Sequence, residues 1–271
     1  MLMELLPVGL ALLATGVIAG VLAGLLGVGG GIVIVPVLYL VLQSLDVSPA
    51  TAILVATGTS LLTIIPTSIS SSRAHHARGN VDFGLIRLWA APMIVAVLAG
   101  SYLATRVNGQ VLSGLFGIVA ILVALNMLFR ANAAALRDTL PGTLGQMALA
   151  SVIGFISVMM GIGGGTLGVP TLTAFNVAAH RAVGTAAVLG LLIAVPGACM
   201  LLLGGETPPD APQGTYGLVN LPGFALIVPM TTLMAPVGVR IGAKLDGASL
   251  KRVFAVFLIV VGCRMIWQTF F

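Results

Sequence analysis

Ten apolar stretches, separated by short loops rich in Gly, Pro, Asn or charged residues, divide this chain from end to end. They lie at about 5–25, 31–44, 50–70, 83–104, 110–129, 143–161, 165–178, 182–203, 221–242 and 249–270. A helix needs about 20 apolar residues to cross a bilayer, and most of the stretches reach that length. Since 59% of the residues are hydrophobic and only 7% are charged, they cannot supply the polar surface of a water-soluble fold. The sequence therefore predicts an all-α, polytopic membrane protein.

Two of these stretches, 31–44 and 165–178, are too short to cross a bilayer alone. Each contains 14 residues, which gives about 21 Å of helix against a hydrocarbon core of about 30 Å. Each directly follows three consecutive glycines. We therefore expect each to be half of a broken helix or one arm of a re-entrant hairpin, so that eight to ten segments enter the membrane.

The same motif introduces both short stretches, as GVGGGIVIVP in the first half and GIGGGTLGVP in the second. The six motif glycines are Gly29, Gly30, Gly31, Gly163, Gly164 and Gly165. The agreement continues beyond the motif with a gap of four residues, so that Pro66 aligns with Pro196 and Arg106 with Lys244. A collinear match of this length indicates an internal repeat.

The repeat predicts two units of five segments, 1–130 and 143–271, joined by a cytoplasmic linker at 131–142 within one membrane domain. Because five is odd, the second unit enters the membrane from the opposite side, and the repeats are inverted. Inverted repeats whose discontinuous helices meet near the midplane are typical of secondary transporters.

Basic residues predict the orientation, because cytoplasmic loops carry an excess of Lys and Arg. Arg106 and Arg264 fall on one side, and the other Lys and Arg residues fall on the opposite side, which we assign to the cytoplasm. Both chain ends are then outside, as is the loop 204–217, which has acids and prolines but no base. The first stretch lacks a basic leader, so we expect a retained helix rather than a cleaved signal.

Glycine triplets at membrane depth need a compensating role, because each glycine weakens a helix by about 1 kcal/mol relative to alanine. One interpretation is close packing, since small residues let helix backbones approach in lipid. The other is that the chain unwinds at each triplet and restarts as a short helix, whose free amides and positive dipole end face a buried cavity. Two such helix starts would hold one anion between them. The two triplets should then lie close together.

Further polar residues are candidates to help bind that anion. They are Thr57, Ser60, Thr63, Asn126, Thr166, Thr185 and Arg264. Hydroxyls such as those of Thr57 and Ser60, which share a helix face, can donate to an oxyanion or bond back to carbonyls of their own helix. Arg264 aligns with Asn126 in the repeat. It is the best cation for an anionic substrate if it faces inward, and a snorkelling side chain if it does not.

Other chemistry has little support in the sequence. The acids and histidines fall in or near loops or chain ends, with no carboxylate pair and no nucleophile–base group, so we expect no enzyme, cofactor or metal site. The basic residues form no stripe with aromatics, which argues against nucleic acid. Cys199 and Cys263 are predicted to be small buried apolar side chains. The loop SSRAHHARGN, 71–80, is predicted to anchor the cytoplasmic face, with a pH-sensitive gate as the alternative.

The doubled glycine motif, opening each half of a chain of about 270 residues, resembles the sulfite exporter TauE/SafE family of membrane transporters. The resemblance covers about 5–270. It implies a protein of the bacterial inner membrane with seven to nine helices that exports sulfite or an organosulfonate such as sulfoacetate. The residues themselves predict less, namely an anion at the midplane between inverted repeats.

Together these features predict a secondary transporter that works by alternating access, since the chain has no ATP-binding motif. Its partners are a small anion and the bilayer, while a coupled proton or sodium ion and the oligomeric state stay open. The membrane potential alone favours anion export by about 2.3 kcal/mol per charge per 100 mV. The alternative is a passive anion channel, in which the same helix starts line a pore.

Overall fold

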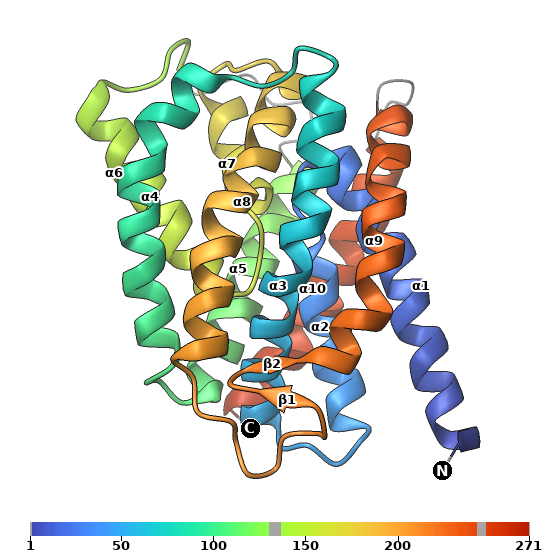
Figure 1. Ribbon diagram of the computed structural model, residues 1–271. Helices are drawn as coiled ribbons and strands as arrows, with labels where there is room; N and C mark the ends of the chain where they lie inside the picture. The colour runs from blue at the N-terminus through green and yellow to red at the C-terminus, as the bar shows by residue number, and fades with distance from the viewer. Residues whose placement is uncertain (1, 130–136, 243–247, 271) are drawn as a thin grey trace.

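A computed structural model describes residues 2–129, 137–242 and 248–270, which contain ten α-helices and one antiparallel pair of strands (Figure 1). The elements are α1 (Leu2–Leu26), α2 (Gly31–Gln43), α3 (Pro49–His76), α4 (Phe83–Ala104), α5 (Gly109–Phe129), α6 (Thr143–Met159), α7 (Gly165–Ala174), α8 (Ala179–Leu203), β1 (Thr215–Tyr216), β2 (Val219–Asn220), α9 (Leu221–Gly242) and α10 (Ala248–Phe270). Each predicted apolar stretch corresponds to one helix. The all-α, polytopic fold is therefore confirmed.

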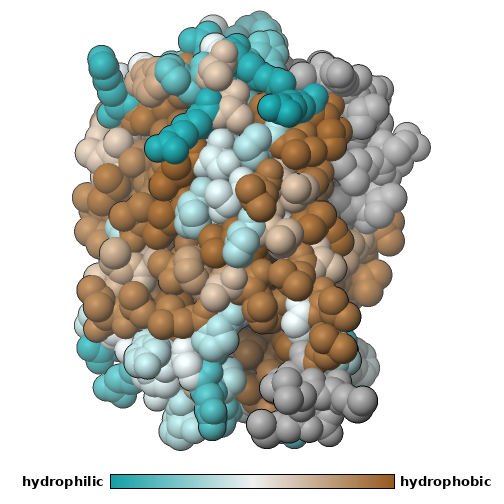
Figure 2. Space-filling view, turned by 45° about the vertical axis from the view of Figure 1, so that its right-hand side comes forward, coloured by the Kyte–Doolittle hydropathy of each residue, from teal (hydrophilic) through white to brown (hydrophobic). Residues whose placement is uncertain are grey.

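A hydrophobic band crosses the middle of the face seen in Figure 2, and hydrophilic residues gather at both ends of that face. Among the described residues, six helices are long and apolar enough to cross a membrane, namely α1, α3, α4, α5, α8 and α9. Large apolar side chains such as Val95 and Leu122 are exposed on their outer faces. This pattern suits a protein whose surrounding solvent is lipid.

Two helical hairpins, α1–α2 and α6–α7, point in opposite directions (Figure 1). The hairpin α1–α2 has its open end near the strands, because the amide of Ser48, just after α2, donates to Asp210 in the loop before β1. The hairpin α6–α7 has its open end at the opposite end, where the Arg137 amide donates to the Ala174 carbonyl. Their tips therefore meet inside the helix bundle. α1 begins and α10 ends at the strand end of the molecule.

The helices pack in matched pairs. α1 packs on α9 and α6 on α4, while α2 packs on α3 and α7 on α8. The remaining large interfaces join α3 to α8, α5 to α10, α3 to α9 and α4 to α8. If each helix is exchanged for the helix five places away in the chain, α1 for α6 and so on, every one of these pairs becomes another of the pairs or itself. An approximate twofold axis would relate the helices in this way.

Several helix ends differ from the prediction, most clearly in α3, which continues to His76 instead of ending near residue 70. Most of the loop predicted at 71–80 is therefore helical, and His75 is buried. Ser71 donates to the Ala23 carbonyl, and His75 Nε2 lies 2.9 Å from the Gly24 carbonyl oxygen. The hydropathy pattern predicted the end of this helix too early, because its polar side chains near the end bond to acceptors inside the protein.

The short helix α7 ends at Ala174, four residues before the predicted end of its stretch. The chain reverses there at Asn176, whose positive φ of 64° is incompatible with a continuing right-handed helix. α2 ends at Gln43, one residue early. The predicted linker, 131–142, lies partly outside the described residues.

The prediction that Cys199 and Cys263 are buried was wrong, since both are exposed. Hydropathy cannot separate the inner from the outer face of a spanning helix, because the lipid-facing surface is as apolar as the interior. A small apolar thiol is compatible with either environment.

Glycines allow α1 and α9 to touch along their backbones. A Cβ on Gly24 would lie 1.9 Å from the Ala235 carbonyl oxygen, and one on Gly238 would lie 2.1 Å from that of Val21. Gly9, nearer the start of α1, has nothing within 4 Å of the position of its absent Cβ. The close contact with α9 is therefore confined to the C-terminal part of α1.

We expect Gly24→Ala to lower the thermal stability of the purified protein, because the methyl group would force α1 and α9 apart, at a cost of about 1–3 kcal/mol for overpacking. Gly9→Ala is the matched control, since it should leave stability unchanged or raise it by up to about 1 kcal/mol through helix propensity. Thermal melts of both variants in detergent test this. Equal stabilities would contradict the contact.

The loop before β1 is attached to the start of α3 by Asp210. Its carboxylate accepts from the Ser48 amide at 3.0 Å and from the Thr51 hydroxyl at 2.5 Å. These hydrogen bonds, with that of Ser48 first, lower the pKa of Asp210 to about 2. The negative charge also lies at the positive end of α3.

Because the folded-state pKa of Asp210 is below its unfolded value, the contribution of Asp210 to stability is present above about pH 4 and is lost as the pH falls toward 2. We expect Asp210→Asn to lower the melting temperature at pH 6 and the difference from wild type to vanish near pH 2. Glu206→Gln, in the same loop, is the control. A pH-independent difference would argue against this role.

Candidate anion site at the hairpin tips

The two glycine triplets lie against each other where the hairpin tips meet. A Cβ on Gly29 would lie 3.4 Å from the Gly163 Cα, and a Cβ on Gly163 would lie 3.2 Å from the Gly29 Cα. A Cβ on Gly165 would come within 2.0 Å of the Gly27 carbonyl oxygen. The expectation that the triplets lie close together is confirmed, and the glycines allow backbone-to-backbone contact that larger residues would prevent.

Glycine is also required by the backbone conformation of the tips. Gly27, Gly29 and Gly30 have φ values of 68°, 69° and 83°, and Gly161 has a φ of 67°. This left-handed region is strained for residues that carry a Cβ. These residues end α1 and α6 and let the chain reverse within a few residues.

The tips lie at membrane depth, against the middle of α3. Ser60 donates to the Gly161 carbonyl at 2.7 Å, and Ile64 lies next to both Gly29 and Gly31. These α3 residues are close to the midpoint of the 28-residue helix. The motif glycines are buried on all sides.

The N-termini of α2 and α7 meet at these tips with their amides unpaired. The first amides of a helix have no acceptor within it, and neither helix has an acidic residue in its first turn or a side-chain cap. Among the described residues, no acceptor binds the amides of residues 29–32 or 163–166. An unpaired buried amide costs about 1–3 kcal/mol, and hydrocarbon offers no water to bind it. The tips therefore present eight donors and two positive helix ends, which suit an anion.

Buried hydroxyls add donors, mainly at the start of α7. Thr57, Ser68, Ser157 and Thr166 are buried, and their side-chain oxygens have no partner among the described residues. A Cβ on Gly190 of α8 would lie 2.8 Å from Ser68 Oγ and 3.8 Å from the Gly164 amide nitrogen. The Ser68 hydroxyl and the first amides of α7 thus border the same small space.

The start of α2 faces backbone carbonyls and apolar side chains instead. A Cβ on Gly31 would meet the Gly161 carbonyl oxygen at 2.5 Å and Ile64 Cδ1 at 2.8 Å, and one on Gly30 would meet the Ala19 carbonyl oxygen at 3.1 Å and its Cβ at 3.2 Å. The two helix starts therefore differ: both contribute amides, but α7 has the side-chain donors.

Two of the predicted hydroxyls have structural roles. Thr63 donates to the Thr59 carbonyl at 2.8 Å, which is the bond back to its own helix. Thr185 accepts from the Asp82 amide at 3.0 Å and thereby fixes the loop before α4. Thr57, Ser60 and Thr166, by contrast, border or belong to the hairpin tips.

The structure does not bring Asn126 and Arg264 to the tips. Asn126 is half-buried in α5 and makes no hydrogen bond with any described residue. Arg264 is exposed on α10, one turn before Gln268, which accepts from the Tyr39 hydroxyl. This exposed position fits the snorkelling alternative.

Sequence reasoning overlooked Ser68, although a signal for it exists. Thr57, Ser60, Ser68, Ser71 and His75 recur along α3 at spacings that place them on one helix face. A polar stripe of this length inside a spanning helix faces protein rather than lipid. Ser68 lies within the predicted stretch, but the stripe to which it belongs is recognised only when the helix is extended past residue 70 to Ser71 and His75.

The apolar helices and the two opposed hairpins define a polytopic α-helical membrane protein. The family model described as sulfite exporter TauE/SafE matches residues 12–265. The chain therefore belongs to this family of membrane transporters.

Relatives match along almost the entire chain. It is 33% identical over 258 residues to a probable membrane transporter protein of Haemophilus influenzae, covering 93% of this chain and 96% of that protein. It is 29% identical over 283 residues to the probable membrane transporter protein YunE of Bacillus subtilis, covering 96% and 98%. A probable membrane transporter of Methanocaldococcus jannaschii is 26% identical over 258 residues, with 94% of each chain covered. No solved structure matches.

We expect Gly165→Ala to abolish transport, because its methyl group would collide with the Gly27 carbonyl and separate the tips. Gly168→Ala, one turn along α7, is the matched control, since its Cβ would have neighbours only at 3.8 Å and beyond. Uptake assays in proteoliposomes, normalised to folded protein, compare the two. Equal activity of the two variants would show that tip contact is dispensable.

Proposed function

We propose that this chain is a secondary transporter that exports a small sulfur-containing oxyanion, sulfite or an organosulfonate such as sulfoacetate. The observation that carries the proposal is the set of unpaired amides at residues 29–32 and 163–166, buried where two helix N-termini meet. The description of the matched family supports a sulfite-like substrate.

Sulfite and sulfonate groups fit these donors chemically. Each carries up to three oxygens on one sulfur, directed to different sides, so amides from two helix starts can donate to one group. Each helix N-terminus is equivalent to about half a positive charge, which offsets part of the cost of removing the anion from water. Hydroxyls of Ser68 and Thr166 add neutral donors. A site without a buried counter-charge also lets the anion leave again.

Alternating access is supported by the arrangement of the hairpins. They enter from opposite ends, and the helix pairs match under an exchange of halves, as expected of inverted repeats that rock against each other around one site. Backbone contact between Gly29 and Gly163, with Ile64 beside it, favours a site that opens to one end at a time over a permanently open pore. The inner membrane, with both chain ends outside, is part of this proposal.

Removing single hydroxyls tests the binding site. We expect Thr166→Val and Ser68→Ala each to weaken sulfite or sulfoacetate binding by about tenfold or more, because a hydrogen bond to a charged group contributes about 1.5–3 kcal/mol. Thr171→Val is the matched control on α7, since the Thr171 hydroxyl bonds back to the Leu167 carbonyl. Binding is measured by thermal shift of purified protein against sulfite, sulfoacetate, sulfate and chloride.

Failure of all four anions to stabilise the wild-type protein would argue against an anion site. Transport is measured separately in proteoliposomes, where we expect slow, saturable flux of the anion that binds. Single-channel currents, or flux far above transporter rates, would instead identify a passive anion channel. The binding and flux measurements therefore test the site and the mechanism independently.

A further inference from the structure

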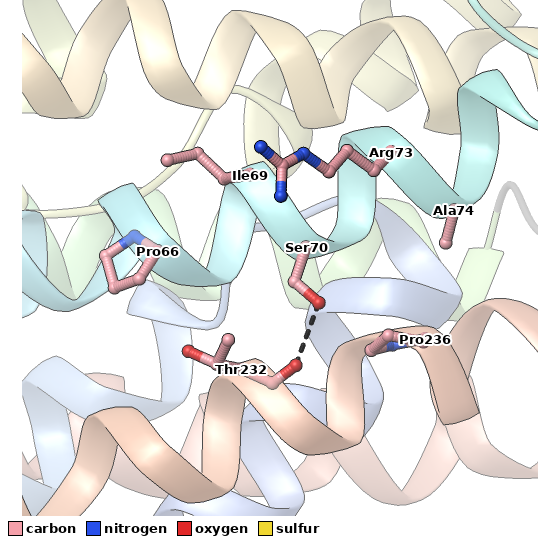
Figure 3. A pocket seen from close by; sticks show the side chains of 7 residues that line it. All are labelled: Pro66, Ile69, Ser70, Arg73, Ala74, Thr232 and Pro236. Atoms are coloured by element: carbon pink, nitrogen blue, oxygen red, sulfur yellow. Dashed lines mark hydrogen bonds between the residues drawn. The ribbon is translucent and has the colours of Figure 1, made fainter.

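A groove on the outside of the helix bundle, between the inner half of α3 and α9, is separate from the hairpin tips. Its volume is about 530 Å³. Its lining residues are Pro66, Ile69, Ser70, Arg73, Ala74, Thr232 and Pro236 (Figure 3). On α3 these residues lie opposite the polar stripe that faces the tips. Ile69 and Arg73 are exposed, so the groove opens toward the surrounding lipid.

Proline chemistry explains why the groove has a polar floor. Pro236 has no amide hydrogen, so the Thr232 carbonyl one turn earlier lacks its helical donor. The Ser70 hydroxyl donates to that carbonyl at 2.8 Å (Figure 3). The Thr232 hydroxyl has no partner among the described residues. The groove therefore has a polar floor, the Ser70–Thr232 hydrogen bond, beside apolar walls.

The groove also contains a cationic side chain, that of Arg73, which pairs with no acidic residue in the described part of the chain. The Arg73 side chain makes no ion pair or hydrogen bond within the described part of the chain, whereas Arg181 pairs with Asp82 and Arg78 donates to the Val239 carbonyl. Figure 3 shows the Arg73 side chain lying back along α3 toward Ile69. Arg73 lines the groove, so its donors are available to a ligand at the rim.

The chemistry of the groove indicates its occupant. A guanidinium binds phosphate oxygens through paired hydrogen bonds, and Arg73 lies within one turn of the end of α3, at the basic end of the molecule. The walls formed by Pro66, Ile69 and Pro236 suit an acyl chain. Arg240, exposed one turn beyond Pro236 on α9, adds positive charge that disfavours a headgroup carrying its own amine. A free phosphate would leave the apolar part of the groove unfilled.

We propose that this groove binds an anionic phospholipid of the cytoplasmic leaflet, such as phosphatidylglycerol. Its phosphate lies on Arg73, and one acyl chain packs along Pro66 and Ile69. The site joins α3, which contacts both hairpin tips, to α9, which contacts α1. The bound lipid therefore holds together two helices that support the hairpins.

Thermal shift of delipidated protein in detergent tests the site, with phosphatidylglycerol, phosphatidylcholine and inorganic phosphate as separate probes. We expect phosphatidylglycerol alone to stabilise the wild type strongly. The concentration for half-maximal stabilisation should rise about tenfold in Arg73→Gln. The half-maximal concentration should not change in Arg87→Gln. This variant removes an exposed arginine near the start of α4, at the same end of the molecule as Arg73. Ala74→Phe, which fills the groove without changing charge, should also weaken the effect.

Equal weakening in Arg73→Gln and Arg87→Gln would overturn the proposal, because it would indicate general attraction between charges. Equal stabilisation by phosphatidylcholine or by inorganic phosphate would overturn it as well. Since no sulfur anion is present in this assay, its outcome is independent of the proposed transport function.

Discussion

Backbone amides inside a bilayer have no water to bind, and this constraint governs the hairpin tips. Breaking α1–α2 and α6–α7 at glycine leaves amides unpaired at two helix starts, at a depth where each would cost about 1–3 kcal/mol if nothing bound it. The tips tolerate this only because they are enclosed by protein and pressed together. An anion between them would satisfy the amides and the two positive helix ends together.

α3 organises the surroundings of that site. One face contacts the tips through Ser60 and Ile64 and contacts α8 through Ser68. The C-terminal end of α3 contacts α1 through Ser71 and His75. The opposite face borders the groove with Arg73. A change at either surface of this helix therefore reaches the hairpins through direct contacts.

The packing and binding interpretations of the glycine triplets are compatible in this structure. Gly165 and Gly31 have no room for a side chain because the opposite tip lies against them. That same contact brings the unpaired amides of both tips into one buried region. Close packing thus creates the candidate site rather than competing with it.

Much of the fold could be predicted because lipid imposes a length and a composition on each helix. The doubled motif predicted that the two triplets lie close together, and the structure confirms it. Helix ends were less predictable, since His75 and Ser71 continue α3 by bonding to α1, a tertiary contact that hydropathy cannot represent. Cys199, Cys263 and Arg264 are exposed because lipid-facing and interior surfaces look alike in an apolar sequence. Ser68 needed the full length of α3 to be recognised.

The central claim is that an anion binds to the backbone amides of the tips. Amide nitrogen and proton chemical shifts of glycine-labelled protein, measured by NMR during titration with sulfite or sulfoacetate, test it most directly. The account predicts saturable shifts at Gly163, Gly164 and Gly165 with none at Gly9, which lies in the open part of α1. Anion binding that leaves the tip glycines unshifted would contradict it.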